Sequence, residues 1–201
     1  MINVIKKFLQ TAFLGTHMEI DQKILNSLFK EAEAFPEEGG SDIYYAGLAV
    51  LVGDMVRNLP RLPSELFNSV VSSAVKAGAF PYFDPSYSDK LPKGMAAKAA
   101  AGRPSIRILR QPDIIHEWTI GPGKRLFEGF NGKLKELVCK GKDSSYNKYI
   151  EKRLRTQEDL RNDIAITVLK TFFSANLVWY PLAVYVTQII IKTPIEKYCK
   201  F

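Results

Sequence analysis

Histidine and cysteine are scarce in this chain, which has two of each among its 201 residues. The histidines are His17 and His116, and the cysteines, Cys139 and Cys199, form no CxxC pair. Because protein metal centres use such ligands at short, regular spacing, the sequence predicts no metal site, and it indicates no cofactor. Two cysteines are also too few for the disulfide framework of a small secreted protein, so we expect both to be small buried thiols.

A secretory signal is also lacking. The opening stretch MINVIKKFLQTAFLG places its lysines after apolar residues, and no continuous apolar core leads to a cleavage site. We therefore predict a reducing, cytoplasmic location, with a peripheral or inserted position at a membrane as the alternative.

Catalytic motifs are incomplete wherever their residues occur. In GPGKR (121–125), Trp118 stands where a phosphate loop needs its first glycine, and Arg125 replaces the magnesium-binding Ser or Thr, so we predict a tight turn with a basic tip. His116 has Glu117 beside it, but no second histidine completes an HExxH motif. The sequence therefore identifies no catalytic residue and no small-molecule substrate.

The composition is that of a folded globular protein, with 46% hydrophobic and 24% charged residues, but the charge is uneven. Residues 1–80 hold 7 basic and 9 acidic side chains, whereas residues 81–201 hold 21 basic and 12 acidic ones. Such an excess of positive charge in one part indicates an anionic partner for that part, or only a solvated basic face.

Helical periodicity dominates residues 1–80. Apolar residues recur at helical spacing from Ile2 to Phe13, and Asp21 begins a second helix whose apolar stripe runs from Ile24 to Phe35. A third helix should begin at Ser41 or Asp42 and end before Pro60. A fourth extends from Pro63 to Gly78, so residues 1–80 are predicted to form a helical bundle.

Residues 81–143 have a different texture. Residues 81–94 are rich in Pro, Asp, Ser and Tyr, which favours an irregular loop, and residues 114–120 alternate as in a strand. Asn131-Gly132 is a type I′ hairpin signal between 125–130 and 133–138, although Leu134, Leu137 and Val138 fit a helix equally well. This middle segment is predicted to be irregular or β-containing.

Residues 144–201 return to helical spacing. Tyr146, Tyr149, Ile150 and Leu154 form one predicted core stripe, and Thr156 with Asp159 resembles a capping box that begins a new helix. Pro181 must kink or interrupt that helix. We thus predict a mostly α fold: an N-terminal bundle (1–80), the middle segment (81–143) and long kinked C-terminal helices (144–201) that pack back on the bundle.

The stretch from Thr171 to Ile191 carries no charge and is long enough to cross a bilayer. It also contains Asn176 and Gln188, and Trp179 and Tyr180 lie in its middle rather than at its ends, which favours a buried helix packed on residues 43–56. The alternatives are a membrane helix and a homo-oligomer contact. For both, the candidate contact residues are Phe172, Phe173, Trp179, Tyr180, Val184 and Ile190.

Basic residues interleaved with aromatic ones are the strongest functional signal in the chain. Cations beside aromatic side chains suit phosphate contacts with base stacking, and they suit lipid headgroups or an acidic protein equally well. The candidate anionic-partner residues are Arg103, Arg107, Arg110, Lys124, Arg125, Lys133, Lys135, Lys140, Lys152, Arg153 and Arg155.

The sequence therefore favours a non-enzymatic interaction or assembly protein whose basic C-terminal region binds an acidic protein, an anionic lipid or a nucleic acid. A membrane-associated or membrane-perturbing protein acting through residues 164–191 is the second hypothesis. An enzyme whose site leaves no local motif is the third.

Overall fold

The computed structural model of the chain describes residues 20–34, 40–58, 69, 72, 117–173 and 177–200. These residues are largely helical and include no strand, which confirms the mostly α prediction. The elements are α2 (Gln22–Glu33), α3 (Asp42–Asn58), α6 (Glu117–Cys139), α7 (Ser145–Ile150), α8 (Gln157–Val168), the π-helical turn η6 (Leu169–Phe173), the 3-10 turn η7 (Leu177–Trp179), α9 (Tyr180–Ile191) and α10 (Ile195–Tyr198).

The predicted four-helix bundle of residues 1–80 stays a prediction, because its first helix and most of its fourth lie outside the described residues. The second and third predicted helices correspond to α2 and α3. Asp21 caps α2 as expected, since its carboxylate accepts hydrogen bonds from the backbone N–H of Lys23 and Ile24. The predicted loop at 81–94 and His116 also lie outside the described residues.

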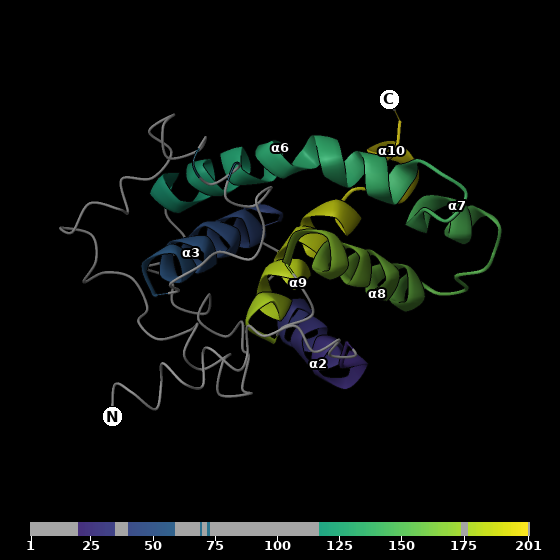
Figure 1. Cartoon of the computed structure of the whole chain (residues 1–201), viewed down its shortest axis with the longest axis horizontal. Helices are drawn as coiled ribbons and strands as arrows, with labels where there is room; N and C mark the ends of the chain where they lie inside the picture. The colour runs from purple at the N-terminus through teal and green to yellow at the C-terminus, as the bar shows by residue number, and fades with distance from the viewer. Residues whose placement is uncertain are drawn as a thin grey trace.

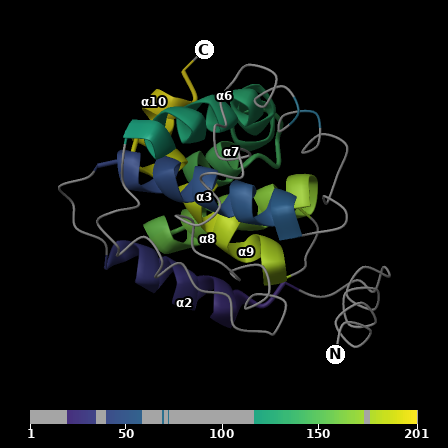
Figure 2. The same ribbon diagram turned by 90° about the vertical axis from the view of Figure 1, so that its left-hand side faces the viewer.

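Helix α9 lies at the centre of the described part of the molecule. It packs against α2, α3 and α8, as predicted for the contact with residues 43–56. In Figures 1 and 2, α6 and α2 lie on opposite sides, with α3, α8 and α9 between them. One hydrophobic cluster extends from α2 to α10 through these central helices.

The chargeless stretch 171–191 is divided among several elements. Pro181 lies in the first turn of α9, where its missing N–H is harmless, so the predicted interruption by Pro181 is confirmed. No helix in the described part of the chain combines the length and the apolar composition needed to cross a membrane. The six residues proposed for a membrane or oligomer contact are at most 1% exposed in this structure: Phe172, Phe173, Trp179, Tyr180, Val184 and Ile190.

Polar contacts fix how α8 and α2 meet. The predicted capping box is confirmed, because Thr156 and Asp159 each accept a hydrogen bond from the other's backbone N–H at the start of α8.

The buried Arg161 guanidinium pairs with Glu33 and lies 4.3 Å from the centroid of the Phe29 ring. One arginine thus links α8 to the last turn of α2 through both charge and ring packing.

The predicted hairpin at Asn131-Gly132 is wrong, because both residues lie within α6. Buried Leu126, Phe130 and Leu134 follow the four-residue spacing of a helix and pack into the core. The strand prediction for 114–120 is likewise wrong where it is described, since residues 117–120 are helical.

The GPGKR segment is not a turn either, because it lies in the first half of α6. Its second glycine, Gly123, lies so close to α3 that an added Cβ would be 1.8 Å from the carbonyl oxygen of Tyr45. The glycine is therefore explained by a close helix crossing. The neighbouring Lys124 forms an ion pair with Asp42 across the same crossing at 2.9 Å.

Candidate basic interaction surface

The two cysteines are joined by a disulfide between Cys139, the last residue of α6, and Cys199, just after α10. They are buried as predicted, but the expectation of two reduced thiols is wrong. The two cysteines are 60 residues apart in the sequence, so no local motif indicates that they form a disulfide. Disulfides persist in oxidising compartments and are rare in reduced ones, so the argument for a reducing, cytoplasmic location no longer holds.

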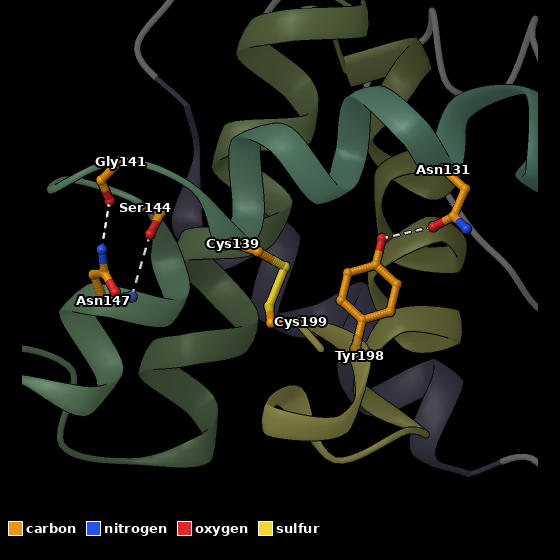
Figure 3. Close-up of a disulfide and its surroundings, with 7 residues drawn as sticks. All are labelled: Asn131, Cys139, Gly141, Ser144, Asn147, Tyr198 and Cys199. Atoms are coloured by element: carbon orange, nitrogen blue, oxygen red, sulfur yellow. Dashed lines mark hydrogen bonds between the residues drawn. A yellow bond between two sulfur atoms is a disulfide. The ribbon is translucent and has the colours of Figure 1, made fainter. Parts of the chain in front are cut away.

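A second contact fixes α10 to α6 beside the disulfide. The Tyr198 hydroxyl donates a hydrogen bond to the side-chain oxygen of Asn131 at 2.9 Å (Figure 3). The ammonium group of Lys135 lies 5.7 Å from the centroid of the Tyr198 ring. These contacts and the disulfide hold α10 beside the C-terminal half of α6, and a lysine follows each cysteine, Lys140 and Lys200.

The connection from α6 to α7 is fixed by hydrogen bonds. Gly141 has a φ of 90°, a left-handed conformation that suits glycine after a helix end. Its carbonyl oxygen accepts a 2.7 Å hydrogen bond from the side-chain amide of Asn147, and Ser144 caps α7 through the Asn147 backbone N–H (Figure 3). The chain after the disulfide is therefore folded directly back against α7.

Arg153 connects this loop to the turn that follows α7. Its guanidinium forms ion pairs with Asp143 at 3.2 Å and Glu151 at 2.9 Å. It also donates a 2.7 Å hydrogen bond to the carbonyl oxygen of Lys142. One arginine thus pairs with both acidic side chains between Lys140 and Arg155 and holds the Lys142 carbonyl near the 151–153 turn.

We define the basic end as the surface formed where α6 ends and α7 and α10 pack beside it, at the right of Figure 1. Its exposed cationic residues are Lys140, Lys142, Lys152, Arg153, Arg155, Lys197 and Lys200. Three of them, Lys142, Lys152 and Arg155, form no salt bridge within the described part of the chain. Their charge is therefore available to an external anion.

The predicted basic residues do not form one surface. Arg103, Arg107 and Arg110 lie outside the described residues. Lys124 and Arg125 lie in the N-terminal half of α6, about 22 Å along the helix from Lys140. Of the candidates in the described part, only Lys140, Lys152, Arg153 and Arg155 belong to the basic end.

Several of the remaining candidates are engaged within the chain. The hydrogen bond from Lys124 to Asp42 raises the pKa of that lysine. Lys133 pairs with Glu136 at 2.8 Å, and this hydrogen bond lowers the pKa of the glutamate carboxyl. Lys135 contacts the Tyr198 ring, as described above. These three lysines therefore stabilise α6 and its neighbours.

One polar cluster beneath the basic end invites a catalytic interpretation. The Ser145 hydroxyl donates a 2.7 Å hydrogen bond to one Asp163 oxygen, and Lys148 donates a 2.8 Å bond to the other. Ser145 is only 1% exposed, so no substrate reaches its oxygen. The cluster joins α7 to α8, and no group of residues in the described ranges has the make-up of a metal site.

Two features of the basic end escaped prediction. Lys197 and Lys200 join it only because the disulfide brings α10 to the end of α6, and no local pattern reveals that. The predicted core stripe of Tyr146, Tyr149, Ile150 and Leu154 is wrong for Ile150, which is 53% exposed. The other three pack against the core. The prediction extended one helical face from Tyr146 to Leu154, but α7 ends at Ile150, so helical spacing does not apply beyond that residue.

Comparison with known proteins adds no functional assignment, because no family model, no curated protein and no solved structure matches the chain.

Proposed function

We propose that the protein is a non-enzymatic interaction protein whose basic end binds an anionic partner. The observation that carries the proposal is the arrangement around Arg153. Because this residue pairs with both Asp143 and Glu151, neither carboxylate forms an ion pair with Lys142, Lys152 or Arg155, which are exposed.

The rigidity of the basic end supports the same proposal. The disulfide, the Tyr198–Asn131 hydrogen bond and the Asn147–Gly141 hydrogen bond hold its three segments in fixed positions. A backbone that is already fixed loses little further freedom when its cations bind an anion, so less of the interaction energy is lost to ordering.

The experiment is a comparison of two double variants on immobilised heparin, a generic polyanion. Lys142→Glu with Lys152→Glu reverses two charges of the basic end. Lys23→Glu with Lys30→Glu reverses two exposed lysines of α2 and changes the net charge by the same amount. If heparin binding depends on net charge alone, both variants should lose affinity equally. If heparin binds at the basic end, only the first variant should lose affinity.

We expect the wild-type protein and the α2 variant to elute at similar salt concentrations, and the basic-end variant to elute at a clearly lower one. Equal elution of the two variants contradicts the proposal, because binding then follows net charge. Failure of the wild-type protein to bind heparin at low salt contradicts it as well.

A further inference from the structure

The basic end carries one apolar side chain that its electrostatics do not explain. Ile150, the last residue of α7, is 53% exposed and is the one large hydrophobic residue exposed to this extent in the described ranges. A single exposed aliphatic residue is common on protein surfaces. Exposed cations that follow it closely in the chain, Lys152 and Arg155, and its fixed backbone distinguish Ile150 from an ordinary surface residue.

The backbone after Ile150 is held in a defined turn. Lys152 has a φ of 59°, a left-handed conformation that few residues other than glycine adopt. The backbone N–H groups of Arg153 and Leu154 both donate to the carbonyl oxygen of Lys148, at 2.8 and 3.2 Å. This turn ends α7, which lies at the right-hand edge of Figure 1, directly after its last residue, Ile150.

The unpaired charges next to Ile150 in the chain are positive. Lys152 follows it by two residues, Arg155 by five, and Lys142 is held nearby through its carbonyl bond to Arg153. The nearby carboxylates of Glu151 and Asp143 are bound by Arg153, and that of Asp163 is bound by Lys148. Within residues 141–155, the exposed charged side chains that form no ion pair, Lys142, Lys152 and Arg155, are all positive, whereas the carboxylates of Asp159 and Glu196 lie outside this segment.

We propose that the anionic partner is a lipid bilayer, with Ile150 inserted at the boundary of headgroups and acyl chains and with Lys142, Lys152 and Arg155 contacting the headgroups. This inference rests on the proposed function. A bilayer has an apolar layer directly beneath its anionic headgroups. The exposed aliphatic side chain of Ile150 suits that apolar layer, and the cations next to it suit the headgroups.

Nucleic acid fits the same surface less well. Binding of single strands relies on exposed aromatic rings for base stacking. The aromatic residues of α7, Tyr146 and Tyr149, pack against the core, and the Tyr149 hydroxyl accepts a hydrogen bond from Gln157. An exposed isoleucine offers a base no stacking face and a phosphate no donor.

The test uses the full-length, oxidised protein and sedimentation with vesicles. One vesicle contains phosphatidylcholine alone, and the other contains phosphatidylcholine with phosphatidylserine. Ile150→Ser removes the apolar side chain, and Ile150→Leu is the control variant because it keeps an aliphatic side chain of the same size. Because Ile150 is exposed, neither change removes core packing, and thermal unfolding of both variants verifies that they fold.

We expect binding to the phosphatidylserine vesicles only, a loss of about tenfold in affinity for Ile150→Ser, and nearly unchanged affinity for Ile150→Leu. Heparin elution of Ile150→Ser should match that of the wild-type protein, because heparin offers no apolar layer. Equal vesicle affinity of Ile150→Ser and wild type overturns the insertion of Ile150.

A depth measurement provides a second, independent readout. Both native cysteines are in the disulfide, so a new cysteine is the one site for a thiol-reactive, environment-sensitive dye. Dye at Ile150→Cys should shift to the blue with phosphatidylserine vesicles, whereas dye at Gln22→Cys, an exposed position on α2, should not. Absence of the shift at position 150 overturns the inference.

The two proposals fail in different ways. If the wild-type protein binds heparin through the basic end but ignores phosphatidylserine vesicles, the lipid inference is wrong and the proposed function stands. Binding to RNA or DNA without binding to vesicles has the same meaning. If the protein does not bind heparin either, the proposed function itself is wrong.

Discussion

Gly123 of α6 lies directly against the backbone of Tyr45 in α3: a Cβ on the glycine would be 1.8 Å from the Tyr45 carbonyl oxygen. Because the neighbour is backbone and not a movable side chain, the two helices would have to separate to admit a methyl group. We expect Gly123→Ala to lower the free energy of unfolding by about 3 kcal/mol.

The matched control is Gly132→Ala, further along the same helix, where an added Cβ meets nothing within 4 Å. Alanine is the better helix former, so this change should raise stability by about 0.5–1 kcal/mol. Urea unfolding of both variants measures the difference. A Gly123→Ala protein as stable as wild type would show that α3 and α6 do not cross this closely.

Periodicity and capping signals predicted those elements that depend on local interactions. Asp21 and Thr156 begin α2 and α8 as expected, because a cap bonds to backbone groups only two or three residues away. The burial of residues 180–190 agrees with the prediction made from the polar Gln188 and from the central position of Trp179 and Tyr180 in the chargeless stretch.

The errors concern long-range contacts. Asn131-Gly132 is a turn signal by itself, but the core contacts of Phe130 and Leu134 outweigh that two-residue preference and keep α6 helical. The sequence predicts a turn at Gly123 because the backbone against which it packs, that of Tyr45, is distant in the sequence. The disulfide, which decides where Lys197 and Lys200 lie, depends on three-dimensional proximity alone.

Breaking the Cys139–Cys199 bond should destabilise the whole fold. The disulfide closes a loop of 60 residues, and loss of its constraint on the unfolded chain corresponds to about 4 kcal/mol in the chain-entropy model. We expect urea unfolding in dithiothreitol to show this loss. The Cys139→Ser, Cys199→Ser double variant should be equally destabilised and should not respond to dithiothreitol. A wild-type protein that also does not respond would contradict the disulfide between the two cysteines.

Buried tyrosines should make the protein sensitive to alkaline pH. Burial raises the pKa of Tyr44, Tyr185 and Tyr198 above the ordinary value. A pKa raised in the folded state means that the stabilisation is complete below the ordinary tyrosine pKa of about 10 and is lost as the pH rises beyond it. We expect the free energy of unfolding to fall steadily above that pH.

Tyrosine absorbance during an alkaline titration checks this directly. Exposed tyrosines should ionise first, and the buried ones only as the protein unfolds. Tyr198→Phe keeps the buried ring but removes the ionisable hydroxyl, so its alkaline loss should be smaller, although it lacks the hydrogen bond to Asn131 at neutral pH. Simultaneous ionisation of all tyrosines in a folded protein would show that they are not buried.

Two threonines in different surroundings should respond oppositely to the same substitution. Thr187 in α9 is fully buried, and its hydroxyl oxygen has no hydrogen-bond partner in the described structure. Thr156, by contrast, is exposed, and its hydroxyl accepts a 3.0 Å hydrogen bond from the backbone N–H of Asp159 at the start of α8. Replacement by valine removes the hydroxyl and leaves the side-chain shape almost unchanged.

Thr187→Val should therefore raise the free energy of unfolding by about 1 kcal/mol, because a buried hydroxyl without a partner is lost. Thr156→Val should lower it by about 1 kcal/mol, because the helix cap is lost. Urea unfolding of the two variants side by side gives the signs directly. A destabilised Thr187→Val protein would mean that the Thr187 hydroxyl is hydrogen-bonded, and the centre of α9 would then hold a polar contact in place of apolar packing alone.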